Sequence, residues 1–138
     1  MNIFLDANIC LDLLDTTRPT SKKSVEWYLN HKDNETLHFY FSADFITTIY
    51  YVLTEKRKFT PQETLDAIDG LSSEITPHYL IHNDFISAKN QFLDEACKDF
   101  EDFLILQSAK RLNCTEFITN DKELLKFEKY IDMKIIKP

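Results

Sequence analysis

The stretch of sequence that determines the fold is Asn2-Ile3-Phe4-Leu5-Asp6-Ala7-Asn8. Its apolar run from Ile3 to Leu5 predicts a strand buried on both faces, which is typical of a parallel sheet covered by helices. Asp6 then stands at the carboxyl end of that strand, where open α/β sheets bind their ligands. A carboxylate in this position needs a cation or hydrogen bonds to compensate it. Asp6 is therefore either part of a site or the cap of a helix that begins near Ala7.

Composition and charge limit the classes of protein. The chain has 138 residues, of which 43% are hydrophobic, and this predicts a single domain over residues 1–138. We expect no membrane span and no secretory signal, and the odd number of three cysteines favours the cytoplasm. The single glycine excludes a Walker loop and a dinucleotide-binding fingerprint. The net charge of −7 argues against broad adhesion to nucleic acid, but a nuclease with an acidic metal site remains open.

Strand and helix patterns alternate along the chain. Strands are expected at 3–5, 37–41, 75–81, 116–119 and 133–136, with one or two helical segments between successive strands. The helix that starts after Thr60 is expected to end at Gly70, and another helix is expected at 83–97. Such alternation predicts right-handed crossovers and therefore an α/β fold with a parallel sheet.

Three carboxylates stand where strands or linkers lead into helices: Asp6, Asp102 and Asp121. These positions face one edge of a parallel sheet, and Asp99 is expected on the same helical face as Asp102. Clustered carboxylates repel one another, so some stay protonated unless a cation lies between them. An all-oxygen set suits Mg²⁺ or Mn²⁺, which can activate water for phosphodiester hydrolysis. The alternative is that these acids are helix caps and a solvated rim.

Four blocks of the sequence resemble, in order, the signatures of a PIN domain, most closely those of bacterial VapC-type toxins. The blocks are Leu5-Asp6-Ala7-Asn8, Ser42-Ala43-Asp44-Phe45-Ile46-Thr47-Thr48-Ile49-Tyr50-Tyr51, Asp99-Phe100-Glu101-Asp102-Phe103 and Ile118-Thr119-Asn120-Asp121. Each block alone is weak, but together they cover essentially the whole chain. The resemblance implies a three-layer α/β/α sandwich with a central parallel sheet of about five strands, and a metal-dependent endoribonuclease that cleaves RNA. For a toxin it also implies an antitoxin partner and a homodimer.

The resemblance assigns roles to individual residues. Asp6, Asp102 and Asp121 match the catalytic carboxylates that hold Mg²⁺ or Mn²⁺, and Asp99 is a further candidate ligand. Three residues match supporting positions, namely a polar residue after the first acid, a hydroxyl before the last acid and an auxiliary acid after it: Asn8, Thr119 and Glu123.

The sequence departs from the family at one position. The family has a glutamate in the helix after the second strand, and the register places Thr48 there. Threonine supplies no negative ligand. Asp44, one helical turn earlier, is a candidate replacement as a metal ligand, or else it caps the helix. The missing acid motivates an alternative function, a catalytically weak PIN module that acts as an RNA- or protein-binding scaffold.

Two other classes of α/β protein fit less well. A phosphatase of the haloacid-dehalogenase type uses the aspartate after its first strand as a nucleophile, but it needs a second aspartate where this chain has Asn8. A receiver domain needs adjacent acidic residues upstream of its phosphorylated aspartate.

Lys56-Arg57-Lys58 is the densest basic run of this acidic chain. Basic side chains of this kind can contact an RNA backbone. The alternative is that they complement the dipole at the C-terminal end of a helix.

Overall fold

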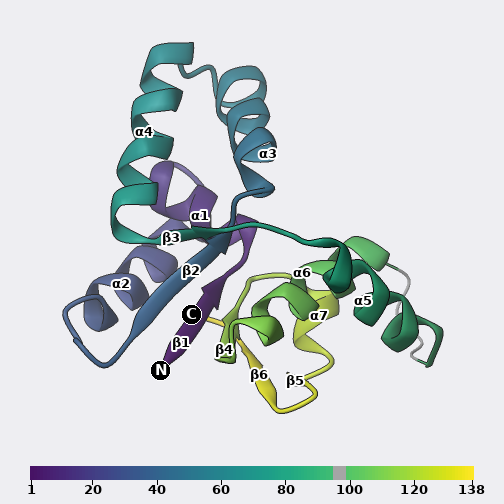
Figure 1. Cartoon of the computed structure of the whole chain (residues 1–138). Coiled ribbons are helices and arrows are strands. Elements are labelled where there is room, and N and C mark those ends of the chain that lie inside the picture. The colour runs from purple at the N-terminus through teal and green to yellow at the C-terminus, as the bar shows by residue number, and fades with distance from the viewer. Residues whose placement is uncertain (95–98) are drawn as a thin grey trace.

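The computed structural model describes residues 1–94 and 99–138 and shows a six-stranded sheet with helices on both sides (Figure 1). The strands are β1 (Asn2–Leu5), β2 (His38–Ser42), β3 (Thr76–His78), β4 (Cys114–Ile118), β5 (Lys129–Tyr130) and β6 (Met133–Ile136). Their order across the sheet is β3-β2-β1-β4-β6-β5, and only β5 and β6 pair antiparallel. The predicted α/β/α sandwich is confirmed, with six strands in place of about five and with one antiparallel pair.

The helices lie between the strands, as the alternating pattern predicts. They are α1 (Ala7–Leu14), α2 (Ser21–His31), α3 (Phe45–Tyr51), α4 (Pro61–Glu74), α5 (His82–Asp94), α6 (Phe100–Arg111) and α7 (Lys122–Leu125), with a π-helix, η1 (Val52–Lys56), continuing α3. The expected helix at 83–97 is α5, and positions 95–97 lie outside the described residues. Among those that are described, no helix combines the length and the apolar character needed to cross a membrane.

Three expectations about these elements are wrong. The strand expected at 75–81 is shorter, because only Thr76–His78 pairs with β2 and forms β3. Helix α4 continues through Gly70 to Glu74, because Ile68 and Leu71 on either side of the glycine are both buried and the apolar face extends past it. Strand β5 was not expected. The chain turns between Tyr130 and Met133, and Ile131 at this turn has φ 56°. Because left-handed turns usually carry glycine or asparagine, the sequence holds no turn signal here.

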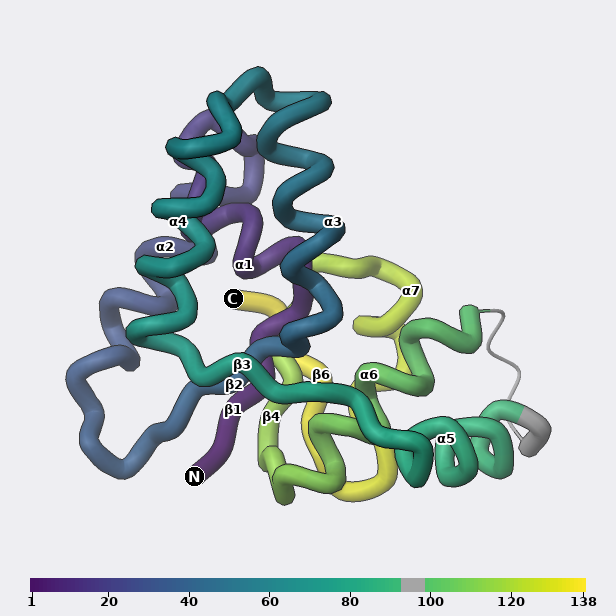
Figure 2. Tube along the Cα trace, turned by 45° about the horizontal axis from the view of Figure 1, so that its top comes forward, coloured from purple at the N-terminus to yellow at the C-terminus, as the bar shows by residue number. Residues whose placement is uncertain are grey.

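The chain order reverses next to β1. The connections from β1 to β2 and from β2 to β3 run in one direction across the sheet. The connection from β3 to β4 runs in the opposite direction, past β2 and β1. Right-handed crossovers in opposite directions place their helices on opposite faces of a sheet. Figure 2 shows accordingly that α1 to α4 lie together and that α5 to α7 form a separate group. The gap between β1 and β4 is therefore the topological switch point, where sheets of this kind bind ligands.

Apolar packing fixes the two strands at this switch point. Ile3, Phe4 and Leu5 are all buried, as expected for a central strand covered on both faces. The ring of Phe4 stacks on the ring of Phe117 in β4, with a centroid separation of 5.5 Å and an interplanar angle of 7°. This contact holds the ends of β1 and β4, and thus the residues that follow them, at fixed positions.

Candidate active site

Asp6 is held by hydrogen bonds to both of its carboxylate oxygens. Its backbone N–H continues the sheet by donating to the Ile118 carbonyl, at 3.0 Å. Its Oδ1 accepts from the Ala7 N–H at 2.7 Å, so Asp6 is the N-cap of α1. Its Oδ2 accepts from the Thr119 hydroxyl at 2.7 Å and from the Asn8 side-chain amide at 3.1 Å. Asp6 therefore has the capping role of the simpler interpretation and, in addition, a fixed orientation toward the end of β4.

Asn8 and Thr119 join the two strand ends. The Asn8 amide also donates to Thr119 Oγ1 at 3.1 Å, and Asn8 Oδ1 accepts from the backbone N–H of Asn120 at 2.9 Å. Thr119 is fully buried, and its Oγ1 accepts from the Asp121 N–H at 3.0 Å. The side chains expected to support the site thus bind the turn that carries Asp121.

Asp121 and Asp102 approach the same region from different helices. Asp121 is the N-cap of α7, and its Oδ1 accepts from the N–H groups of Glu123 at 2.8 Å and Leu124 at 3.4 Å. Asp102 lies in the first turn of α6. The two residues come from helices on the same side of the sheet, so they lie close together although they are separated in the sequence.

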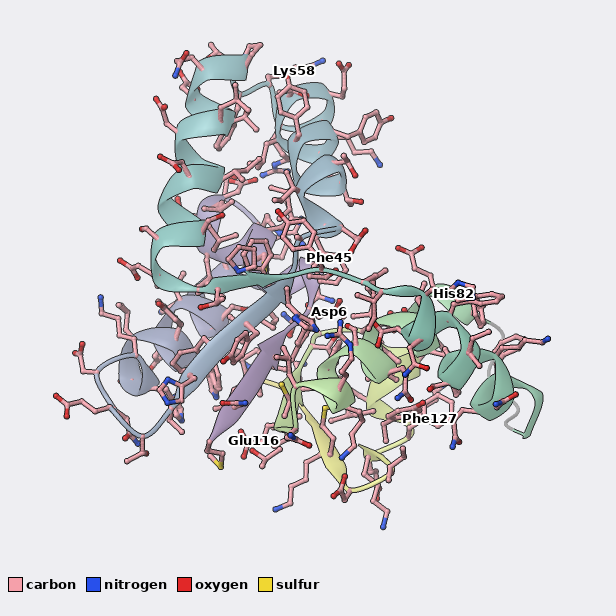
Figure 3. The ribbon with its side chains drawn as sticks, in the orientation of Figure 1. Asp6, Phe45, Lys58, His82, Glu116 and Phe127 are labelled. Atoms are coloured by element: carbon pink, nitrogen blue, oxygen red, sulfur yellow. The ribbon has the colours of Figure 1, made fainter. Side chains whose placement is uncertain are left out.

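A cavity of about 300 Å³ collects these groups. Its polar lining comes from Asp6, Asn8, Thr48, Glu101, Asp102 and Asp121. Apolar walls are supplied by Phe45, Ile105 and Phe117, among others. Figure 3 shows Asp6 next to Phe45 at the foot of α3, between the group of helices that includes α3 and α4 and the group that includes α5 and α6.

Burial and mutual repulsion raise the pKa values of two carboxyl groups in the cavity. Burial raises the pKa of Asp6, and the charge of Asp121 raises it further, against hydrogen bonds from Thr119 and Ala7 that lower it. Burial, followed by the negative charges of Asp99, Asp121 and Asp6, raises the pKa of Asp102 to about 7. The cavity is therefore a region of concentrated negative potential that favours a cation or a proton.

The donor set fits a hard divalent cation in its chemistry. The ligands available are carboxylate oxygens, which Mg²⁺ and Mn²⁺ prefer. In the described part of the chain, no group of three or more His, Cys, Asp or Glu residues is already arranged as a metal site. Asp6, Asp102 and Asp121 nevertheless line the same cavity.

Two other predicted site residues, Asp99 and Glu123, do not line the cavity. Asp99 is the N-cap of α6, where its Oδ1 accepts from the Glu101 N–H at 3.0 Å, and its negative charge is the largest contribution after burial to the raised pKa of Asp102. Glu123 is exposed and forms an ion pair with Lys126 at 3.0 Å. Each acid therefore already has a local structural partner.

Asp44, the candidate for the missing acid, does not line the cavity. Its Oδ2 accepts from the Ser42 hydroxyl and from the Leu80 N–H, both at 3.3 Å. Leu80 belongs to the segment between β3 and α5, which crosses the end of β2 (Figure 1). Thr48, in contrast, lines the cavity at the position expected for the family's glutamate.

Two acidic residues were missed by the sequence analysis. Glu101 lines the cavity, and its only signal was its place beside Asp102 in the third block. Asp12 is fully buried in α1 and binds Arg18, Thr20, Ser24 and Asn120. Within α1 it follows the helical spacing of apolar residues, so nothing local distinguished it from a solvent-exposed acid.

The basic run lies away from the acidic cavity. Lys58 is at the tip of the arm formed by α3, η1 and α4, far from Asp6 (Figure 3). Arg57 Nε donates to Asp15 Oδ2 at 2.6 Å, and its guanidinium also bonds to Thr17. Arg57 thus joins the end of η1 to the end of α1, and this is a structural role.

We expect Arg57→Gln to lower the free energy of unfolding by about 1.5 kcal/mol near neutral pH, because buried Asp15 loses its charged partner. Burial raises the pKa of Asp15, but Thr17 and Arg57 together hold it below its ordinary value. A carboxyl group whose pKa is lowered in the folded state stabilises the protein at pH values above its ordinary pKa. This stability is lost as the pH falls through the folded-state pKa. The effect of Arg57→Gln should therefore shrink in acid. Urea unfolding at neutral and acidic pH measures it, with exposed Lys56→Gln as the control, and equal losses in both variants would contradict this role.

The fold and the position of the cavity together indicate the class of protein. Two carboxylates that follow adjacent parallel strands of an α/β/α sandwich, and a third from a covering helix, line one cavity at the switch point. The chain belongs to the PIN domain family, whose model matches residues 3–130.

Solved structures support the same fold. VapC20 of Mycobacterium tuberculosis, described as a sarcin-ricin loop cleaving toxin, is 12% identical with a TM-score of 0.72, over 96% of this chain and 98% of that one. VapBC-1 of nontypeable Haemophilus influenzae is 16% identical with a TM-score of 0.69, over 99% and 98%. VapBC2 of Rickettsia felis, bound to a fragment of promoter DNA, is 13% identical with a TM-score of 0.68, over 100% and 99%. No curated protein sequence matches the chain significantly.

Proposed function

We propose that this chain is a Mg²⁺- or Mn²⁺-dependent endoribonuclease with Asp6, Asp102 and Asp121 as its metal-holding carboxylates. The observation that carries the proposal is the cavity these three residues share at the switch point, where burial and then the negative charges of Asp99, Asp121 and Asp6 raise the pKa of Asp102 to about 7. Similarity to a sarcin-ricin loop cleaving toxin supports RNA as the substrate. The family match over residues 3–130 supports a single PIN domain.

A bound divalent ion would neutralise the carboxylates and supply the Lewis acid that phosphodiester hydrolysis requires. The residues of the chain prepare for this in distinct ways. Asn8 and Thr119 orient Asp6, and the cap of α7 orients Asp121. Burial and the acidic neighbours raise the pKa of Asp102 to about 7 in the metal-free protein, and a bound cation would favour its ionised form, in which it can serve as a ligand.

Metal titration and RNA cleavage with the purified protein test this proposal. Cleavage should stop in EDTA and return on addition of Mn²⁺ or Mg²⁺. The Asp121→Asn variant should lose cleavage under the same conditions, because it keeps the cap acceptor but lacks the charge. Cleavage that persists in EDTA, or that is equal in wild type and Asp121→Asn, would show that the activity belongs to something else.

The proposal extends to the protein's surroundings. Neighbours solved as VapBC complexes support an antitoxin as partner. A homodimer follows only from the resemblance to toxins. The cytoplasm is the proposed location, consistent with the unpaired, buried Cys10 and Cys114. Co-purification with the product of an adjacent small gene tests the antitoxin.

A second candidate function is a catalytically weak PIN module that binds RNA or protein as a scaffold. It is favoured by Thr48, which lines the cavity where a fourth carboxylate would strengthen metal binding. Binding of RNA by the wild type without any metal-dependent cleavage would support this alternative over the enzyme.

Thr48→Glu is expected to strengthen Mn²⁺ binding about tenfold, because it adds a carboxylate to the cavity lining and a change near the ligands of a metal typically alters affinity by that order. Thr48→Gln has the same length without the charge and should leave the affinity near that of wild type. Isothermal titration with Mn²⁺ measures both variants. Weaker binding by Thr48→Glu than by Thr48→Gln would show that Thr48 does not face the ion.

A further inference from the structure

Asp12 is a buried charge that the proposed chemistry does not use. It lies in α1 with no exposed surface, and it does not line the cavity. Burying a carboxylate is costly unless hydrogen bonds and an opposite charge compensate it. The compensation here is extensive, since donors reach Asp12 from the loop before α2, from α2 itself and from the turn after β4.

The two oxygens of Asp12 face different parts of the molecule. Oδ1 accepts from Arg18 Nε and from the Thr20 hydroxyl, both at 2.8 Å. Oδ2 accepts from the Ser24 hydroxyl at 2.5 Å and from the side-chain amide of Asn120 at 3.1 Å. The first pair of bonds fixes the corner between α1 and α2, and only the second oxygen reaches toward the cavity.

Asn120 connects Asp12 to the site. It stands between Thr119, which binds Asp6, and Asp121, which lines the cavity. Its backbone N–H donates to Asn8 Oδ1 at 2.9 Å, while its side-chain amide points away to Asp12 and to Ser24 Oγ at 3.3 Å. The turn after β4 is thus hydrogen-bonded to Asn8 through the backbone of Asn120 and to the Asp12 carboxylate through the Asn120 side chain.

We propose that Asp12 is a positioning residue for the acidic cavity, acting through Asn120 to fix the turn that carries Thr119 and Asp121. Asp12 contacts neither the ion nor the substrate. The part of this inference that concerns metal binding rests on the function proposed above. Because residues that orient metal ligands typically change affinity 10- to 100-fold when they are mutated, the link has a measurable consequence.

A purely structural role for Asp12 predicts something different. If Asp12 only joined α1 to α2, then loss of any one donor would lower stability and leave the cavity unchanged. The two oxygens allow these roles to be separated, because Asn120→Ala removes a donor on the cavity side and Thr20→Val removes one on the far side. In both variants Asp12 keeps Arg18 and two hydroxyl or amide donors, so both are expected to fold.

The experiment compares these two variants with wild type by two readouts. The first is hydrogen exchange of the backbone amide at position 120 in metal-free protein, followed by NMR. The second is the Mn²⁺ dissociation constant from isothermal titration. We expect Asn120→Ala to speed exchange at position 120 and to weaken Mn²⁺ binding, each about tenfold, and Thr20→Val to change neither by more than about twofold. Unchanged exchange and affinity in Asn120→Ala would overturn the proposal.

A double-mutant cycle identifies Asp12 as the origin of the effect. Asp12→Asn should weaken Mn²⁺ binding in the wild-type background but not further in Asn120→Ala, because the two residues act along one path. Equal losses in both backgrounds would overturn the proposal, and if Asp12→Asn does not fold, the first two variants decide alone. A wild type that binds no Mn²⁺ would refute the metal site and not the positioning role, which the exchange measurement then tests by itself.

Discussion

Asp6→Asn is expected to lower metal-dependent RNA cleavage about 1,000-fold, because loss of a metal-holding carboxylate removes several kcal/mol of transition-state stabilisation. Asparagine keeps the shape of the side chain and an oxygen that can accept from the Ala7 N–H, so the cap of α1 is retained. Its amide nitrogen would replace Oδ2 and face the Asn8 amide, which is also a donor, so unfolding has to be measured alongside cleavage to assign the loss to the missing charge.

Initial rates of RNA cleavage at saturating Mn²⁺ measure this effect. Asp66→Asn is a matched control, since Asp66 is an exposed aspartate on α4 whose Oδ1 accepts from Gln62 at 2.9 Å, and it does not line the cavity. The control should retain the wild-type rate and both variants should unfold at similar urea concentrations. A cleavage rate of Asp6→Asn within about tenfold of the wild-type rate would show that Asp6 is not a metal-holding carboxylate.

Asp102→Asn is expected to stabilise the metal-free protein by about 2 kcal/mol near pH 8, after allowance for the solvent screening of a half-buried carboxyl group. Burial and the neighbouring acids raise the folded-state pKa of Asp102 from its ordinary value of 3.8 to about 7. A raised pKa means that the native state binds the proton more tightly than the unfolded chain does. The stability that this group contributes is fully present at pH values below its ordinary pKa, and it is lost as the pH rises toward about 7.

The pH dependence gives this prediction its test. Wild type in EDTA should lose stability between about pH 4 and pH 7, and Asp102→Asn should lose less, so that the two proteins are alike near pH 4 and differ near pH 8. Urea unfolding at a series of pH values measures the difference, and Asp66→Asn should follow wild type throughout. A destabilised Asp102→Asn, or a difference that does not vary with pH, would mean that Asp102 is not held against negative neighbours.

The sequence was informative wherever chemistry and local pattern coincide. Ile3 to Leu5 predicted a buried central strand, and Asp6 and Asp121 could be placed at one edge of the sheet because each follows the end of an apolar strand within three residues. The hairpin of β5 and β6 could not be predicted, since its turn uses Ile131 in a left-handed conformation without glycine.

The features of the site that could not be predicted depend on side-chain partners from distant segments of the chain. Asp44 was a reasonable substitute ligand by helical spacing, but the Leu80 N–H from the segment before α5 binds it. Asp12 looked like an ordinary acid, yet its donors lie up to 108 residues away, at Asn120. Long-range hydrogen bonds of this kind leave no periodic or local signal in a single sequence.

The convergence of acids far apart in the chain is tested most directly by the anomalous diffraction of manganese in crystals grown with Mn²⁺. We predict one strong anomalous peak inside the cavity, bounded by the carboxylates of Asp6, Asp102 and Asp121, and no such peak in Asp6→Asn crystals. Manganese bound elsewhere, or absent from the cavity of well-ordered wild-type crystals, would contradict the account.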